Sequence, residues 1–215
     1  MKTEIRAFNF DVHAEENEQH GHFLSGRPIV FGQRANLWNP KIGDYIEVIE
    51  QGALDGTDLK DVRFLVNHNT DMIPLARSRN NNENSTMQMS VDDDGMNIRV
   101  DLDTENNADA KSLYSAVGRG DITGMSFMFV VDKDKDRWED LDTKQPVRHV
   151  RSIRQVLEVS AVTFPAYSQT SIQTRGLSDA LDGAAESLES EKTRLAELKL
   201  AKEKIKLKAR IDNGD

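Results

Sequence analysis

A period-two pattern surrounds the sequence Asp-Asp-Asp-Gly at residues 92–95. Apolar residues alternate with polar ones on both sides of it, between Met87 and Leu102. Alternation of this kind turns one face of each strand towards a core, and an Asp-Gly pair favours a tight turn between antiparallel strands. The sequence therefore predicts a β-hairpin here, and with it a fold in which sheets form the core.

Most of the first 175 residues are predicted to form further strands. Short runs of β-branched and aromatic residues alternate with turn residues. One helix is expected after the hairpin, capped by Asn107 or Asp109 and ended by Gly118 or Gly120. Many strands with one or two helices favour a barrel or a strongly bent sheet over βαβ units. The runs predicted as strands are residues 23–31, 45–49, 62–66, 124–131, 147–156 and 159–164.

The composition changes near Gly176. Beyond it the chain has no Phe, Tyr, Trp or Pro, and Glu, Lys, Leu and Ala dominate, which predicts a helix over residues 177–211. Leucines recur at a spacing of seven, but Glu191 and Lys202 interrupt the heptad pattern of a coiled coil. Both a mobile charged helix and an interaction helix stay open. The predicted domains are residues 1–175 and residues 176–215.

The charge balance and the absence of cysteine exclude several function classes. The formal net charge is -9, whereas broad binding to nucleic acid relies on Lys and Arg, so no nucleic-acid partner is expected. A chain without cysteine has no disulfides, thiolate catalysis or cysteine-ligated metals, and fits a reducing cytoplasm. No apolar run is long enough to cross a bilayer and no signal-peptide pattern is found, so no membrane partner is expected.

Neither a metal nor a cofactor is expected. His13, His20 and His22 lie near three glutamates at residues 15–18, but their spacing matches no standard zinc site. The sequence Gly-Arg-Gly at residues 118–120 lacks the spacing of a phosphate-binding loop, and we interpret it as a turn.

Two residues stand where a strand would present a reactive side chain. His68 follows the apolar run at residues 62–66, so the strand would hold the imidazole in place while the following loop exposes it. Ser126 alternates with Met125 and Phe127 and would point to the opposite face of its strand. A serine hydroxyl needs a base to become nucleophilic. Ser126 and His68 are therefore candidates for the nucleophile and the general base of a serine peptidase. A surface or structural histidine, and a small polar residue tolerated in a barrel, stay open as the alternative readings of these two positions.

The third catalytic residue has two candidates. Glu158 lies inside the apolar run at residues 156–162, where a buried carboxylate needs a partner such as an imidazolium. The alternative is His149, which lies in a basic stretch at residues 148–151. For each residue a non-catalytic interpretation stays open: Glu158 faces water on an edge strand, or His149 is an exposed surface histidine. Oxyanion donors are expected among the amides of residues 74–79 or 151–154.

Several short motifs, taken in order, resemble the prohead (capsid maturation) proteases of tailed bacteriophages, which are related in fold to the herpesvirus assemblin proteases. The similarity covers roughly residues 26–175. Two departures flank the predicted site: Asn69 stands for a common aspartate and Ala76 for a common glycine. The motifs are Gly-Ala-Leu at 52–54, Val-Asn-His-Asn at 66–69, Pro-Leu-Ala-Arg at 74–77, Asp-Gly at 94–95, Ala-Val-Gly-Arg-Gly at 116–120, Gly-Met-Ser-Phe at 124–127, Leu-Glu-Val-Ser-Ala-Val at 157–162 and Pro-Ala-Tyr at 165–167.

The resemblance implies a mixed, β-rich fold with a herpesvirus-protease-like β-barrel core, surrounding helices and a charged C-terminal helix. It implies a serine endopeptidase that cuts scaffold segments, the major capsid protein and itself inside the immature capsid, or prohead, in the host cytoplasm. Self-association is compatible with it. His68 and Ser126 match the family's base and nucleophile, and Glu158 matches its acidic position, whereas the herpesvirus relatives use a second histidine.

Two rival functions stay open at this point. A non-catalytic scaffold or structural protein could retain the protease fold, although the presence of both His68 and Ser126 argues against it. A serine hydrolase of small esters is the second rival, but the chain lacks the Gly-x-Ser-x-Gly motif of the α/β-hydrolases.

Overall fold

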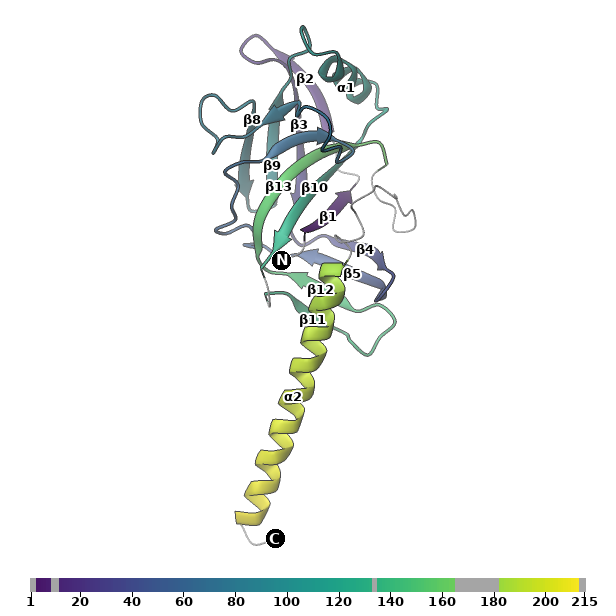
Figure 1. Cartoon of the computed structure of the whole chain (residues 1–215), viewed down its shortest axis with the longest axis vertical. Helices are drawn as coiled ribbons and strands as arrows, with labels where there is room; N and C mark the ends of the chain where they lie inside the picture. Colours follow the sequence, from purple (N-terminus) through teal and green to yellow (C-terminus); the bar gives the residue numbers. More distant parts are fainter. Residues whose placement is uncertain (1–2, 9–11, 133–134, 165–181, 213–215) are drawn as a thin grey trace.

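The computed structural model of the chain describes residues 3–8, 12–132, 135–164 and 182–212. Within these residues the chain forms 13 strands in three sheets and two helices (Figure 1). The strands are β1 (Thr3–Phe8), β2 (Val12–Asn17), β3 (Gly21–Val30), β4 (Arg34–Asn39), β5 (Gly43–Ile49), β6 (Arg63–Val66), β7 (Ala76–Arg77), β8 (Met87–Asp92), β9 (Gly95–Asp101), β10 (Gly124–Val131), β11 (Arg137–Glu139), β12 (Val147–Val150) and β13 (Ile153–Val162). The helices are α1 (Ala108–Gly118) and α2 (Asp182–Asp212).

Sheet A contains five strands in the order β1-β10-β13-β6-β7. The β13–β6 pair is parallel and the other pairs are antiparallel. Along β10, Met125, Phe127 and Phe129 are fully buried in the main core, as the alternation predicts. The intervening residues therefore turn to the other face of the sheet, and Ser126 is one of them.

Sheet B has the order β2-β3-β9-β8 and contains the predicted hairpin. The register of β8 and β9 pairs Met89 with Ile98 and Val91 with Met96, so the alternating apolar residues share one face. Gly95 ends the turn with φ of 150°, and a Cβ there would lie 1.9 Å from the carbonyl oxygen of Ile29. Only glycine fits this position, and the prediction of a hairpin is confirmed.

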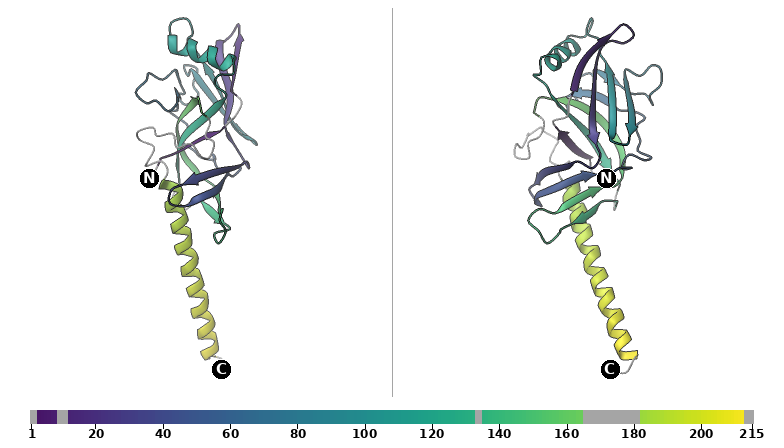
Figure 2. Two further views of the ribbon diagram at one scale, coloured as in Figure 1. Left: turned by 90° about the vertical axis from the view of Figure 1, so that its right-hand side faces the viewer. Right: turned by 180° about the vertical axis from the view of Figure 1, so that it is seen from behind.

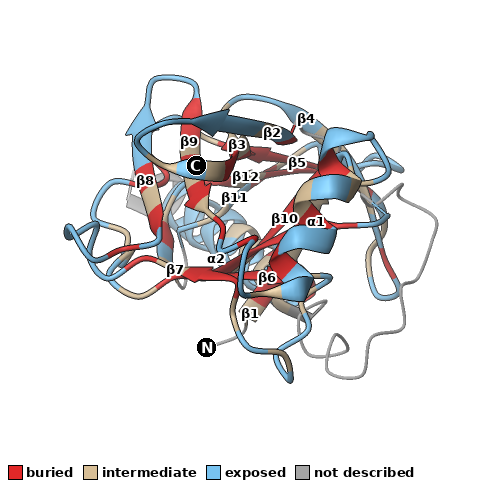
Figure 3. Ribbon diagram, turned by 90° about the horizontal axis from the view of Figure 1, so that it is seen from above, coloured by how far each residue is buried: buried red, intermediate tan, exposed pale blue. Residues whose placement is uncertain are grey.

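One core cluster joins sheets A and B, and α1 packs against it. Asn107 caps α1, because its side chain accepts hydrogen bonds from the amides of Asp109 and Ala110. The buried residues Ala110, Leu113 and Val117 face the core, while the other side of α1 is exposed (Figure 3). The predicted helix is therefore confirmed, and of the two candidate caps, Asn107 and Asp109, the structure has Asn107.

Sheet C is smaller, with the order β11-β12-β5-β4, and its β12–β5 pair is parallel. It includes β11, which lies in the charged segment at residues 132–146. Trp138 at the centre of β11 is buried against Tyr45. This aromatic contact draws the segment into the sheet.

The prediction of a β-barrel core is wrong, because the three sheets do not form a closed barrel in the described parts of the chain. The herpesvirus-like fold is not confirmed. Several helices were expected around the core. In the described residues, α1 is the one helix that packs on the joint core of sheets A and B.

Two strand boundaries also differ from the prediction. The chain leaves sheet C after Val150 and enters sheet A at Ile153, so the break falls at residues 151–152 and not at 157–158. Strands β1, β2, β4, β7 and β11 were not predicted.

Helix α2 spans 31 residues and confirms the predicted charged C-terminal helix. Its first turns pack on sheet C, where Ala184 and Leu188 are buried beside Tyr45 and Trp138. The indole of Trp138 donates to the hydroxyl of Ser187 at 3.0 Å. The rest of the helix projects from the body as an exposed arm (Figures 1 and 2). The predicted boundary at residue 176 lies outside the described residues.

In the described ranges, no helix combines the length and the apolar character needed to cross a membrane.

Candidate active site

Three polar residues lie on the face of sheet A that turns away from the main core. The register pairs Ser126 with Ser160 and Met128 with Glu158, and paired residues of neighbouring strands share a face. Their sequence neighbours Phe127 and Val159 lie in the core cluster on the opposite face. Ser126, Glu158 and Ser160 are therefore brought together by the pairing of β10 with β13, across 32 residues or more of sequence.

His68 follows β6 in a turn of unusual backbone geometry. Asn67 and His68 both adopt left-handed conformations, with φ of 52° and 56°. Such conformations cost non-glycine residues about 1 to 3 kcal/mol each and need support from their surroundings. The support comes from β13, because the Asn67 amide donates to the carbonyl of Ala161 at 2.9 Å and the His68 amide donates to Ser160 Oγ at 3.1 Å. This turn places the imidazole over β13.

The imidazole of His68 contacts the carboxylate of Glu158. Nδ1 of the ring lies against Oε1, and both side chains are nearly buried, with exposed fractions of 11% and 4%. The second carboxylate oxygen, Oε2, accepts a hydrogen bond from Ser160 Oγ at 2.6 Å. A carboxylate beside Nδ1 favours the tautomer in which Nδ1 carries the proton and Nε2 has a free lone pair. Nε2 of His68 is buried and has no hydrogen-bond partner among the described residues.

Ser126 is fully buried between β1 and β13. Its hydroxyl donates to the carbonyl oxygen of Arg6 at 2.8 Å. The hydroxyl is thus directed towards β1, and no hydrogen bond to His68 is formed by the described side chains. β10, which bears Ser126, is paired with β13, which bears Glu158.

His149 lies in a different part of the molecule. It belongs to β12 in sheet C, its Nδ1 contacts a carboxylate oxygen of Glu50, and its Nε2 lies 3.4 Å from Glu139. His149 therefore forms a His–Glu pair of its own, separate from the pair of His68 and Glu158. The pair built from Glu158 adjoins the Ser126 strand, and the pair built from His149 does not.

The amides expected to bind an oxyanion are largely engaged. Leu75 and Ser78 donate to the carbonyls of Phe64 and Val62, and Ile153 donates to Ala53 at 2.7 Å. These three amides are therefore not available as oxyanion donors in this conformation.

The N-terminal histidines have separate contacts. His22 Nδ1 lies 2.6 Å from Thr104 Oγ1, its Nε2 lies 3.6 Å from Glu16, and His20 lies 3.8 Å from Asp101. Over the part of the chain that the structure describes, no three His, Asp or Glu residues form a group that could hold a metal ion.

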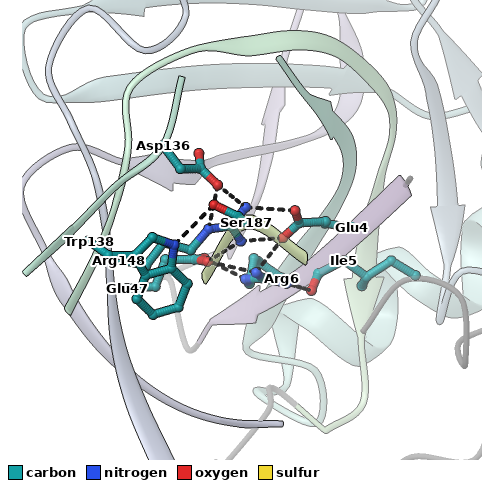
Figure 4. A network of polar contacts seen from close by, with 8 residues as sticks. All are labelled: Glu4, Ile5, Arg6, Glu47, Asp136, Trp138, Arg148 and Ser187. Atoms are coloured by element: carbon teal, nitrogen blue, oxygen red, sulfur yellow. Dashed lines mark hydrogen bonds and ion pairs between the residues drawn. The ribbon is translucent and has the colours of Figure 1, made fainter. Parts of the chain in front are cut away.

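A buried cluster of charged residues was missed by the sequence analysis (Figure 4). Arg6 on β1 donates to Glu47 on β5 and to Glu4, and Arg148 on β12 donates to Glu4, Glu47 and Asp136 at 2.5 to 2.9 Å. The hydroxyl of Ser187 on α2 also contacts Asp136. The available signal was the placement of opposite charges within apolar strands, which only pairing can make tolerable.

The charges in this cluster change the pKa values of its acids. Burial by itself would raise the pKa of Glu4, but the guanidinium groups of Arg148 and Arg6 outweigh it and lower the pKa to about 2. Burial raises the pKa of Asp136, against the opposing effect of Arg148. The carbonyl of Arg6 is also the acceptor of the Ser126 hydroxyl. The cluster therefore fixes the strand that flanks Ser126.

Comparison with known proteins adds one finding. A protein-family model described as caudovirus prohead serine protease matches residues 8–182. No curated protein and no solved structure shows significant similarity to the chain.

Proposed function

This chain belongs to the family of caudovirus prohead serine proteases, a family of serine peptidases, and we propose that it is the endopeptidase that matures a phage capsid. Its substrates would be scaffold segments, the major capsid protein and the chain itself. It would act inside the prohead in the host cytoplasm. We further propose that residues 1–175 form the protease domain and that the α2 arm serves incorporation into the capsid.

The observation that carries this proposal is the buried His68–Glu158 pair, whose Glu158 shares one face of sheet A with Ser126. Glu158 would hold the proton on Nδ1 of His68 and stabilise the imidazolium that forms during the reaction. The unpartnered Nε2 of His68 would then accept the Ser126 proton. For this step the Ser126 hydroxyl must leave the Arg6 carbonyl and turn towards Nε2.

The proposed reaction is acyl transfer. Oγ of Ser126 attacks the scissile carbonyl carbon as its proton moves to His68 Nε2, and backbone amides hold the resulting oxyanion. The carbon–nitrogen bond then breaks, and the proton passes from Nε2 to the leaving amine. Water next attacks the acyl-enzyme, with His68 acting as base again, which releases the acid product and regenerates the serine hydroxyl.

Expression with the cognate capsid protein, followed by mass spectrometry, tests the activity and maps the cut sites. Ser126→Ala should abolish cleavage and self-processing while leaving the fold intact, because it removes only one hydroxyl. A fluorophosphonate probe should label the wild-type enzyme at Ser126, as located by peptide mapping. Normal processing by Ser126→Ala would refute Ser126 as the nucleophile. Absence of processing with the wild-type chain would favour the rival reading, in which the chain is a non-catalytic scaffold or structural protein.

A further inference from the structure

Ser160 hydrogen-bonds to both members of the His–Glu pair. We infer that Ser160 is a positioning residue, which holds Glu158 and His68 in the orientation that lets His68 act as a base; this inference rests on the proposed function. The sequence motif around residue 160 suggested no role for this serine. Its role follows from two contacts made by a single buried hydroxyl.

The hydroxyl of Ser160 is fully buried and makes one hydrogen bond in each direction. It donates to Glu158 Oε2 at 2.6 Å and accepts from the His68 amide at 3.1 Å. A hydroxyl supplies one donor and two acceptor lone pairs, so the bond to Glu158 uses its single proton and the bond from the His68 amide uses one of its lone pairs. Ser160 therefore joins the carboxylate to the backbone of the histidine that the carboxylate contacts.

The bond to Glu158 determines how the carboxylate is oriented. The terminal torsion of a glutamate is broad and nearly two-fold, so it needs an external contact to fix it. With Oε2 held by Ser160, Oε1 is the oxygen that faces Nδ1 of His68. A hydrogen bond to a charged acceptor is among the stronger ones in proteins, and here it lies in a buried site.

The bond to His68 supports the left-handed turn. His68 has φ of 56°, a conformation that a non-glycine residue keeps only where its neighbours hold it. The amide of His68 is the group that Ser160 accepts. Without this acceptor the turn loses its direct tie to β13 at residue 68, and the imidazole can shift relative to Glu158.

Ser160 lies directly opposite Ser126 in the register of β10 and β13, so the two serines share one face of the sheet. Their hydroxyls differ in what they contact. The Ser160 proton is directed at the Glu158 carboxylate, whereas the Ser126 proton is directed at a neutral backbone carbonyl of β1. This difference assigns Ser160 to positioning and leaves Ser126 as the nucleophile.

The test is Ser160→Ala, assayed on a peptide that spans a cut site mapped with the wild-type enzyme. We expect kcat to fall roughly 10- to 100-fold and KM to change less than about threefold, because the variant disturbs the base and not the substrate contacts. The matched control is Ser78→Ala. Ser78 is also fully buried, and its hydroxyl hydrogen-bonds to Asn81 away from the site. This control should keep the wild-type kcat.

A second measurement separates positioning from general stabilisation. The proton on His68 Nδ1, shared with Glu158, should give a downfield resonance in the proton NMR spectrum. Ser160→Ala should shift or broaden this resonance, and Ser78→Ala should not. Ser160→Cys keeps nearly the same volume but supplies only a weak donor, so it serves if the alanine variant fails to fold, with a reduced kcat and a shifted resonance expected.

Each outcome bears on a different statement. If Ser126→Ala is inactive while Ser160→Ala keeps kcat within about threefold of wild type and leaves the resonance in place, the positioning role is refuted and the proposed function stands. If the fluorophosphonate adduct maps to Ser160, Ser160 is the nucleophile and the positioning role is equally refuted. If the wild-type chain cleaves neither the capsid protein nor the peptide and no adduct forms, the proposed function itself fails.

Discussion

Replacing Glu158 with glutamine should affect catalysis through the tautomer of His68. Glu158 Oε2 accepts the Ser160 hydroxyl at 2.6 Å, and Oε1 faces Nδ1 of His68. In the variant, the amide oxygen is the better partner for the Ser160 donor, so the amide nitrogen would face Nδ1. An NH2 group donates there, which forces the ring proton onto Nε2 and leaves that nitrogen unable to accept the Ser126 proton.

The magnitude follows from this exchange of tautomer. A carboxylate-to-amide change beside a catalytic histidine, with the geometry kept, lowers kcat by about 10⁴-fold in serine proteases. At about 1.4 kcal/mol for each factor of ten, this corresponds to about 5 kcal/mol of lost transition-state stabilisation. We therefore expect Glu158→Gln to lower kcat by roughly 10³- to 10⁴-fold with an unchanged fold.

The second His–Glu pair provides a matched control. Glu50 contacts Nδ1 of His149 in the same way that Glu158 contacts His68. Glu50→Gln should keep kcat within about twofold of wild type, because its histidine lies in sheet C. Both variants are assayed by steady-state cleavage of a mapped cut-site peptide, with circular dichroism as the check on folding.

The assignment of Glu158 as the residue that sets the tautomer of His68 is refuted if correctly folded Glu158→Gln loses less than about tenfold in kcat. It is also refuted if Glu50→Gln or His149→Ala is the damaging change, since His149 would then be the third catalytic residue.

Three further predictions concern stability. Arg148→Met leaves the buried acids of the charged cluster without this cation and should lower the free energy of unfolding by about 3 to 5 kcal/mol. Arg119→Met, at an exposed ion pair, should change it little, and equal losses in denaturant titrations would contradict this prediction. The pKa of Glu4 is lowered from 4.5 to about 2, so Glu4 stabilises the fold by about 3 kcal/mol above pH 4.5, and this stabilisation is lost as the pH falls towards 2. The pKa of Asp136 is raised, so its contribution to stability changes with pH in the opposite direction. Unfolding curves of wild type and Glu4→Gln should diverge accordingly, and parallel pH profiles would count against the assignment. Truncation after residue 190 should leave thermal stability unchanged. Truncation after residue 176 removes the buried Leu188 and should lower the free energy of unfolding by about 2 to 4 kcal/mol. Equal melting temperatures for the two truncated chains would show that the first turns of α2 do not contribute to stability.

Local patterns in the sequence were sufficient for several parts of the fold. The alternation around Gly95 predicted the β8–β9 hairpin, and Asn107 predicted the start of α1, because turn and cap preferences act over a few residues. The alternation along residues 124–131 predicted that Ser126 turns away from the apolar side of its strand, since side chains alternate along any strand. The position of His68 at the end of β6 is equally local.

The partners of these residues were decided by the tertiary structure. The sequence left Glu158 and His149 as alternatives, because Glu158 matches the acidic position that the resemblance implies whereas the herpesvirus relatives use a second histidine. The break between two predicted strands was placed at residues 157–158. The chain instead changes sheets at residues 151–152, which places His149 in sheet C and Glu158 beside His68. The order of strands in a sheet depends on contacts between distant segments, and no local pattern contains it.

Local periodicity in the sequence was enough to predict the β8–β9 hairpin, the helices α1 and α2 and the apolar side of β10, because such patterns repeat every few residues. Only the tertiary structure decided that Glu158 and Ser160 are the neighbours of His68, that the sheets do not close in the described residues, and that Arg6 and Arg148 share buried acids. The physical reason is that hydrogen bonds and ion pairs between strands join residues up to 144 positions apart. These contacts form only once the strands have found their order and register.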